Sequence, residues 1–221
     1  MTLYTAAVFE NGMVAKLLDI LVAARTASPQ VSERDEIDRV NRLLSSSASV
    51  ATAMPSATLS ALVDLIAEEV SARPDDRLSK TFTEKLEVAT VAAGTDVSTF
   101  LADTALALRT SQRAGIRRFD DLPLSKWEAE AYYARLHDFA WWVEGDEYDT
   151  FEDGVLAGVA SEHPYGCAYW LPQLISECHA ALLLEGDSAS VAALRSLIPW
   201  ATAPVVREVL RHSSTHLLEA H

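Results

Sequence analysis

Apolar residues recur with the 3.6-residue period of an α-helix along nearly the whole chain, whereas the two-residue alternation of a half-buried strand is almost absent. The segment 57–72 shows the pattern clearly, because five large apolar residues lie on one helical face: Leu59, Leu62, Val63, Ile66 and Val70. Consecutive amphipathic helices bury their apolar faces against one another, so the pattern predicts an all-α protein. We expect a multihelical bundle. An irregular α-solenoid is the alternative, although no repeat of roughly 33–47 residues is detectable.

Capping residues and helix breakers divide this pattern into about ten helices. Ser125 and Glu128 have the spacing of a capping box, and Gly94 stands where a periodic stretch ends. Pro172 lies inside a predicted helix and should kink or divide it. The expected helices span residues 3–26, 33–45, 57–72, 82–93, 97–113, 126–143, 151–161, 165–185, 188–198 and 204–219.

Composition differs between the two halves of the chain. Apolar residues make up 49% and charged residues 23% of the sequence, which is typical of a globular protein and excludes general disorder. All five Trp, all six His and both Cys follow residue 113. Near this point a Gly, a charge cluster and Pro123 indicate a long loop. We expect a helical scaffold half, 1–113, and an aromatic- and acid-rich half, 114–221, with one continuous domain as the alternative.

The second half contains a long acidic stretch without basic residues. No Lys or Arg lies between Arg135 and Arg195, and this interval holds eleven carboxylates, seven of them within 138–153. Aromatic residues are typical anchors of protein interfaces, and carboxylates steer a basic partner toward them. We therefore expect a surface that docks a basic protein partner, formed by Asp138, Trp141, Trp142, Glu144, Asp146, Glu147, Tyr148 and Asp149. The alternative is a solvated acidic loop, followed by acidic residues in the first turn of the next helix, where negative charge interacts favourably with the helix dipole.

The net charge restricts the binding partners that we expect, and the two cysteines bear on the cellular compartment. The formal charge of −14 opposes direct binding to nucleic acid or to an anionic membrane. No apolar run is long enough for a membrane span, and the first residues lack the basic start of a signal peptide. Cys167 and Cys178 would lie about 16 Å apart on one continuous helix, too far for a disulfide unless the chain folds back. We expect two reduced thiols and a cytoplasmic protein.

The common catalytic and metal-binding motifs are missing from the sequence. The chain contains no GxGxxG, GxxxxGK[ST], GxSxG, HExxH or CxxC motif, and no Glu-x-x-His pair of a di-iron bundle. We therefore expect an interaction module of the adaptor, chaperone, immunity or inhibitor kind that uses no cofactor, rather than an enzyme. The sequence leaves open whether it forms a homo-oligomer.

A helical enzyme or small-ligand-binding protein is the alternative function. Its pocket would be aromatic and would lie in the second half, lined by Trp127, Trp141, Trp142, Tyr165, Trp170 and His179. His212 and His216 are four residues apart and form a weak alternative metal site, but two side chains alone do not make one, so we expect no metal. Cys167 and His163 have a suitable spacing for a nucleophile pair, but the sequence shows no residue that would orient them.

Overall fold

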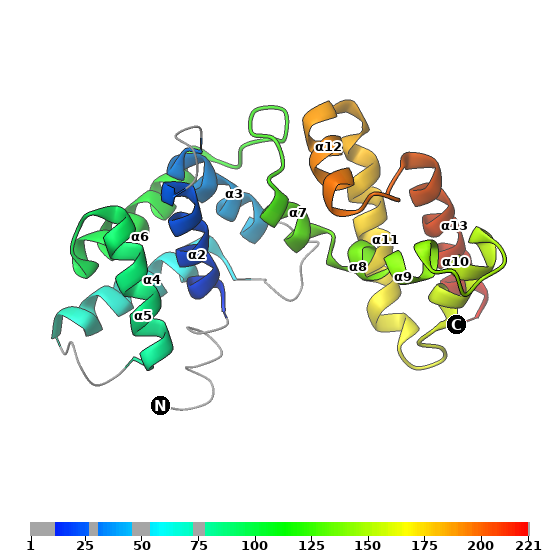
Figure 1. The fold of residues 1–221 in the computed structure, drawn as a ribbon, viewed down its shortest axis with the longest axis horizontal. Coiled ribbons are helices and arrows are strands. Elements are labelled where there is room, and N and C mark those ends of the chain that lie inside the picture. The colour runs from blue at the N-terminus through cyan, green and yellow to red at the C-terminus, as the bar shows by residue number, and fades with distance from the viewer. Residues whose placement is uncertain (1–11, 27–30, 46–53, 73–77, 221) are drawn as a thin grey trace. The chain divides into compact units, whose positions relative to one another are not determined.

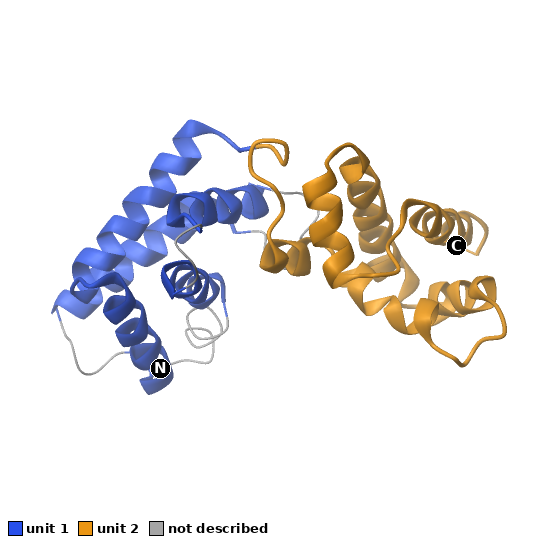
Figure 2. Ribbon diagram, turned by 45° about the horizontal axis from the view of Figure 1, so that its top comes forward, with its two compact units in different colours: residues 1–117 blue, residues 118–221 orange. Residues whose placement is uncertain are grey.

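The computed structural model describes residues 12–26, 31–45, 54–72 and 78–220, and within these ranges it contains helices and no strand. The prediction of an all-α, multihelical protein is therefore confirmed. The chain divides into two compact units, residues 1–117 and 118–221 (Figure 2). The predicted division at 113/114 lies close to this point. The division of roles, with a scaffold half and an aromatic- and acid-rich half, stays a prediction.

The first unit packs five described helices around an aliphatic core (Figure 1). Helix α4 lies along α6, α2 packs against α5, and α3 contacts both α2 and α6. The expected residues 3–11 of the first helix lie outside the described part. The helices of this unit are α2 (Met13–Thr26), α3 (Glu33–Ser45), α4 (Ser56–Ala72), α5 (Lys80–Ala93) and α6 (Val97–Ala114).

A buried polar network joins α3 to the end of α6 in the first unit. The amide of Asn41 donates a hydrogen bond to the Ser111 hydroxyl over 2.8 Å, and this hydroxyl donates in turn to Asp38. At the surface beside it, the Arg117 guanidinium donates to Asp35 over 2.6 Å. These partners offset the cost of burying the polar groups and fix the register of the two helices.

The second unit is organised around α11, which packs along α13 and also contacts α8 and α10. Helix α7 packs on α12, and α10 contacts both α9 and α13 (Figure 1). The elements of this unit are α7 (Lys126–Tyr132), α8 (Ala134–Asp138), α9 (Ala140–Glu144), α10 (Phe151–Ala160), α11 (Cys167–Leu183), the 3₁₀ turn η2 (Leu184–Gly186), α12 (Ser188–Leu197) and α13 (Ala203–Glu219).

Two local predictions have opposite outcomes. The capping box at the start of α7 is confirmed, because Ser125 and Glu128 each accept a hydrogen bond from the other's backbone amide. Pro172 was expected to kink or divide its helix, and a division is not found, because α11 continues through the proline. The proline removes only the hydrogen bond to the carbonyl of Ala168, in the first turn, and packing against α13 supports the rest of the helix.

The single helix expected over 126–143 is also wrong, because the chain breaks at Tyr133 and Phe139 into α7, α8 and α9. Tyr133, Leu136 and Phe139 are all buried, yet they are three residues apart. In a straight α-helix, this spacing rotates each side chain by about 60° from the one before, so a bend is needed to bury all three. The freed amide of Leu136 donates to the Glu177 carboxylate over 2.9 Å.

None of the helices in the described ranges has both the length and the apolar character that a bilayer-spanning segment requires.

Candidate functional site

The acidic loop, defined here as residues 144–149, presents its carboxylates to solvent. Trp141, just before the loop, is 62% exposed. The side chain of Tyr148 packs back on Trp142, with ring centroids 5.9 Å apart. Four carboxylates of the loop have no basic partner among the described residues: Glu144, Asp146, Glu147 and Asp149. Their charges are therefore available to an external cation.

Two glycines on α10 allow α9 to approach this helix closely. A Cβ atom at Gly154 would lie 2.1 Å from the carbonyl oxygen of Trp142. A Cβ at Gly158 would lie 2.6 Å from Cγ of Trp142 and 2.8 Å from the ring of Phe139. The Gly-x-x-x-Gly spacing within the predicted helix 151–161 was the sequence signal for this close approach, and sequence reasoning missed it.

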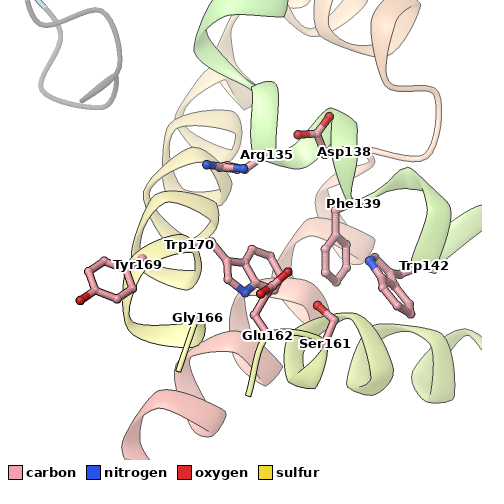
Figure 3. Close-up of a pocket in the computed structure, with 9 residues that line it drawn as sticks. All are labelled: Arg135, Asp138, Phe139, Trp142, Ser161, Glu162, Gly166, Tyr169 and Trp170. Carbon is pink, nitrogen blue, oxygen red and sulfur yellow. The ribbon is translucent and has the colours of Figure 1, made fainter. Parts of the chain in front are cut away.

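A cleft of about 330 Å³ lies beside these rings, between α8, α9, α11 and the loop 161–166 (Figure 3). The rings of Trp170, Phe139 and Trp142 follow one another along it (Figure 3), and the centroids of the first two are 6.1 Å apart. We call this the aromatic cleft. Its lining consists of Arg135, Asp138, Phe139, Trp142, Ser161, Glu162, Gly166, Tyr169 and Trp170.

The charged residues of the aromatic cleft sum to one negative charge. Asp138 and Glu162 supply two carboxylates, and Arg135 supplies one guanidinium, whose Nε donates to Gln173 over 3.0 Å. The indole N–H of Trp170 is buried and has no hydrogen-bond acceptor in the structure. Aromatic faces, carboxylates and an unpaired donor together suit a ligand that carries both a cation and a hydrogen-bond acceptor.

The structure brings together only part of the pocket expected from the sequence. Trp142 and Trp170 line the aromatic cleft, together with Asp138 from the predicted partner surface. Trp127 lies on α7 and does not line it. His179, also expected to line the pocket, is exposed. Nine residues separate it from Trp170, so the two side chains point to opposite faces of α11 at about 100° per residue.

Trp141 and Tyr165 also belong to that expected pocket, and neither lines the aromatic cleft. Tyr165 precedes the start of α11 at Cys167, and 88% of its side chain is exposed. The cleft residues that the sequence did not single out are Arg135, Phe139, Ser161, Glu162, Gly166 and Tyr169.

A buried carboxylate supports the back of the cleft. Glu177 is 5% exposed, and its carboxylate accepts a hydrogen bond from the Leu136 amide at the start of α8. Burial raises the pKa of Glu177 to about 7, although the hydrogen bonds from the backbone of α8 oppose this shift. Glu177 therefore helps to position α8, which carries Arg135 and Asp138.

A second cluster of reactive side chains joins the loop 161–166 to α13. The Sγ atom of Cys167 lies 3.4 Å from Nε2 of His216, and the rings of His163 and His216 are 5.2 Å apart at their centroids. Burial raises the pKa of the Cys167 thiol, and the charge of Glu162 adds to this effect. Both cysteines are free thiols.

His212 and His216, the weak alternative metal site of the sequence analysis, contact different neighbours. His216 faces Cys167 and His163, whereas the Nε2 atom of His212 lies 3.6 Å from Glu152 and 3.8 Å from Glu208. Their spacing of four residues separates the two side chains by about 40° around α13, enough to direct them to different neighbours.

Comparison with known proteins identifies no relative. No protein-family model matches the chain, and neither the curated proteins nor the solved structures contain a significant match. The aromatic cleft and the acidic loop are therefore the basis for a functional assignment.

Proposed function

We propose that this protein is an interaction module that binds a basic segment of a partner protein on its second unit. One lysine or arginine side chain of the partner enters the aromatic cleft, and neighbouring basic residues lie over the acidic loop. The observation that carries the proposal is the aromatic cleft itself, which combines aromatic walls with a net negative charge beside four unpaired carboxylates.

The chemistry of the cleft fits a cationic side chain better than an anionic or an apolar one. A cation over the rings of Trp142 and Trp170 gains up to about 2 kcal/mol when it is desolvated. Asp138 and Glu162 can neutralise it. A peptide also supplies carbonyl groups, one of which can accept the unpaired indole N–H of Trp170. The carboxylates of the acidic loop raise the association rate more than the affinity.

Binding of a free small molecule is the second candidate function. The cleft volume of about 330 Å³ lies at the lower end of the range of small-ligand pockets. Arg135 favours this candidate, because a guanidinium beside two carboxylates can hold a zwitterion such as an amino acid. The two free cysteines support a reducing compartment, so we propose a cytoplasmic location.

The test measures binding of short synthetic peptides to the full chain by tryptophan fluorescence and calorimetry. One peptide carries a central lysine within a basic segment, and its matched control carries norleucine at that position. We expect the norleucine peptide to bind about 10-fold more weakly, because it loses the cation–π contact and the carboxylate pair. Raising the ionic strength from about 0.05 M to about 0.5 M should weaken the binding of both peptides, because salt screens their attraction to the carboxylates.

Two double variants with equal changes in net charge separate the cleft from the general acidity of the chain. The variant Asp138→Asn/Glu162→Gln should bind the lysine peptide more weakly than the wild type does. The variant Glu130→Gln/Glu219→Gln changes exposed positions outside the cleft, and it should bind this peptide with wild-type affinity. Equal losses in both variants would overturn the proposed role of the cleft. Binding of free amino acids without binding of the lysine peptide would favour the small-ligand function.

A further inference from the structure

Three possible metal-ligating atoms converge at the N-terminal end of α11. His163, Cys167 and His216 each offer one ligand atom, and these atoms all lie within 4.8 Å of one another. Cys167 is the first residue of α11, His163 lies four residues earlier in the loop 161–166, and His216 lies near the end of α13. The packing of α13 along α11 brings the third residue to the other two.

The spacing of these atoms is close to that of a metal site. Zinc binds a thiolate at about 2.3 Å and an imidazole at about 2.0 Å, so tetrahedral geometry places the two ligand atoms about 3.6 Å apart. The observed separation of Cys167 Sγ and His216 Nε2 is 3.4 Å. The third ligand, His163, is exposed in a loop and can move the remaining distance without disturbing the core.

The ligand types restrict which ion can bind. One thiolate and two imidazoles form a borderline-soft set that suits zinc and neighbouring transition metals, whereas calcium and magnesium require oxygen ligands. The carboxylate of Glu162 adds negative charge near Cys167, which favours a cation. Three protein ligands leave a fourth tetrahedral position for water or another ligand.

The same geometry is a poor nucleophile–base pair. Cys167 is 0% exposed, so a substrate cannot reach its sulfur without a local opening of the structure. Binding of a metal ion requires a smaller local opening, on the side of the exposed His163, together with loss of the thiol proton.

From this convergence, we infer that His163, Cys167 and His216 form a binding site for one Zn²⁺ ion in the second unit. The inference does not depend on the proposed partner or on the aromatic cleft, because none of the three ligands lines that cleft. Bound zinc ties the loop 161–166 to α11 and α13, and it therefore stabilises the folded second unit.

The experiment titrates the metal-free full chain with Zn²⁺ by calorimetry and with Co²⁺ by absorption. We expect one Zn²⁺ per chain and a sulfur-to-cobalt charge-transfer band, which reports a thiolate ligand directly. His163→Gln should weaken Zn²⁺ binding by about 100-fold or more, since a lost ligand costs at least as much as a lost supporting contact. Because His163 is exposed, this variant tests the site without risk to the core.

Cys167→Ser removes the thiolate and should abolish the charge-transfer band. Its matched control is Cys178→Ser, because Cys178 is an equally buried thiol on the same helix that does not belong to the cluster. His212→Gln is the control on α13. The inference is overturned if Co²⁺ gives no charge-transfer band, or if His163→Gln binds Zn²⁺ like the wild type. It is equally overturned if the control variants lose as much affinity as the ligand variants.

Discussion

Replacing Glu177 by glutamine removes a buried ionisable group while preserving its size and its ability to accept the hydrogen bond from Leu136. The wild-type carboxylate is 5% exposed, and burial raises its pKa from the ordinary 4.5 to about 7. The folded protein therefore binds a proton at this position more tightly than the unfolded chain does.

The size of the effect follows from this difference in pKa. A difference of about 2.5 units corresponds to about 3 kcal/mol, at about 1.4 kcal/mol per unit. Below pH 4.5 the group is protonated in both states and has no effect on the free energy of unfolding. Between pH 4.5 and about 7 the wild type loses stability as the pH rises, and above about 7 the full loss is present.

We therefore expect Glu177→Gln to match the wild type near pH 4 and to be more stable near pH 8, by up to about 3 kcal/mol. Urea unfolding at several pH values between these limits measures the free energy of unfolding of both proteins. The other ionisable groups contribute equally to the two values, so their contributions cancel in the difference. Glu130→Gln is the control, because Glu130 is exposed on α7. A difference between Glu177→Gln and the wild type that does not change with pH would refute the reasoning. So would a variant that is less stable at high pH, since Glu177 would then have a stabilising partner when ionised.

Three further substitutions test the packing and the local hydrogen bonds by chemical denaturation. Gly158→Ala should destabilise the second unit by about 1–2 kcal/mol, because the added Cβ would lie 2.6 Å from Cγ of Trp142. An unchanged denaturation midpoint would contradict the close approach of α9 to α10. Ser125→Ala should cost about 1 kcal/mol through loss of the capping box, and Ser125→Asp should retain most of that stability. Ser111→Ala should cost about 1–3 kcal/mol, because Asp38 and Asn41 lose their shared buried partner; an effect within error would show that water replaces it.

The parts of the fold that depend on local chemistry were predictable from the sequence. Helical periodicity and the capping residues act over a few residues, so they gave the all-α fold and the start of α7 correctly. The breaks at Tyr133 and Phe139 depend instead on burial in a common core. Glu177, which caps the start of α8, is forty-one residues away from Leu136 in the sequence. Such a contact leaves no local signal.

The candidate site was predictable only in its composition. Asp138, Trp142 and Trp170 were named from the sequence, but the aromatic cleft also includes Glu162 from the loop before α11 and Tyr169 from α11 itself. The pairing of Cys167 with His163 was visible as a spacing of four residues. Their third neighbour, His216, is forty-nine residues from Cys167 and becomes apparent only when α13 packs along α11.

The loop 161–166 links the two proposed sites, because consecutive residues of this loop face different neighbours. Glu162 lines the aromatic cleft, whereas His163 belongs to the cluster with Cys167. Neutralising Glu162 removes a charge from the cleft and leaves all three metal ligands in place. Replacing His163 removes a ligand and leaves every residue of the cleft lining unchanged. We therefore expect the Glu162 variant to lose peptide binding and keep Zn²⁺ binding, and the His163 variant to show the reverse. Full peptide binding by the Glu162 variant would count against the cleft alone, and full Zn²⁺ binding by the His163 variant would count against the metal site alone, even though both sites depend on how this loop folds.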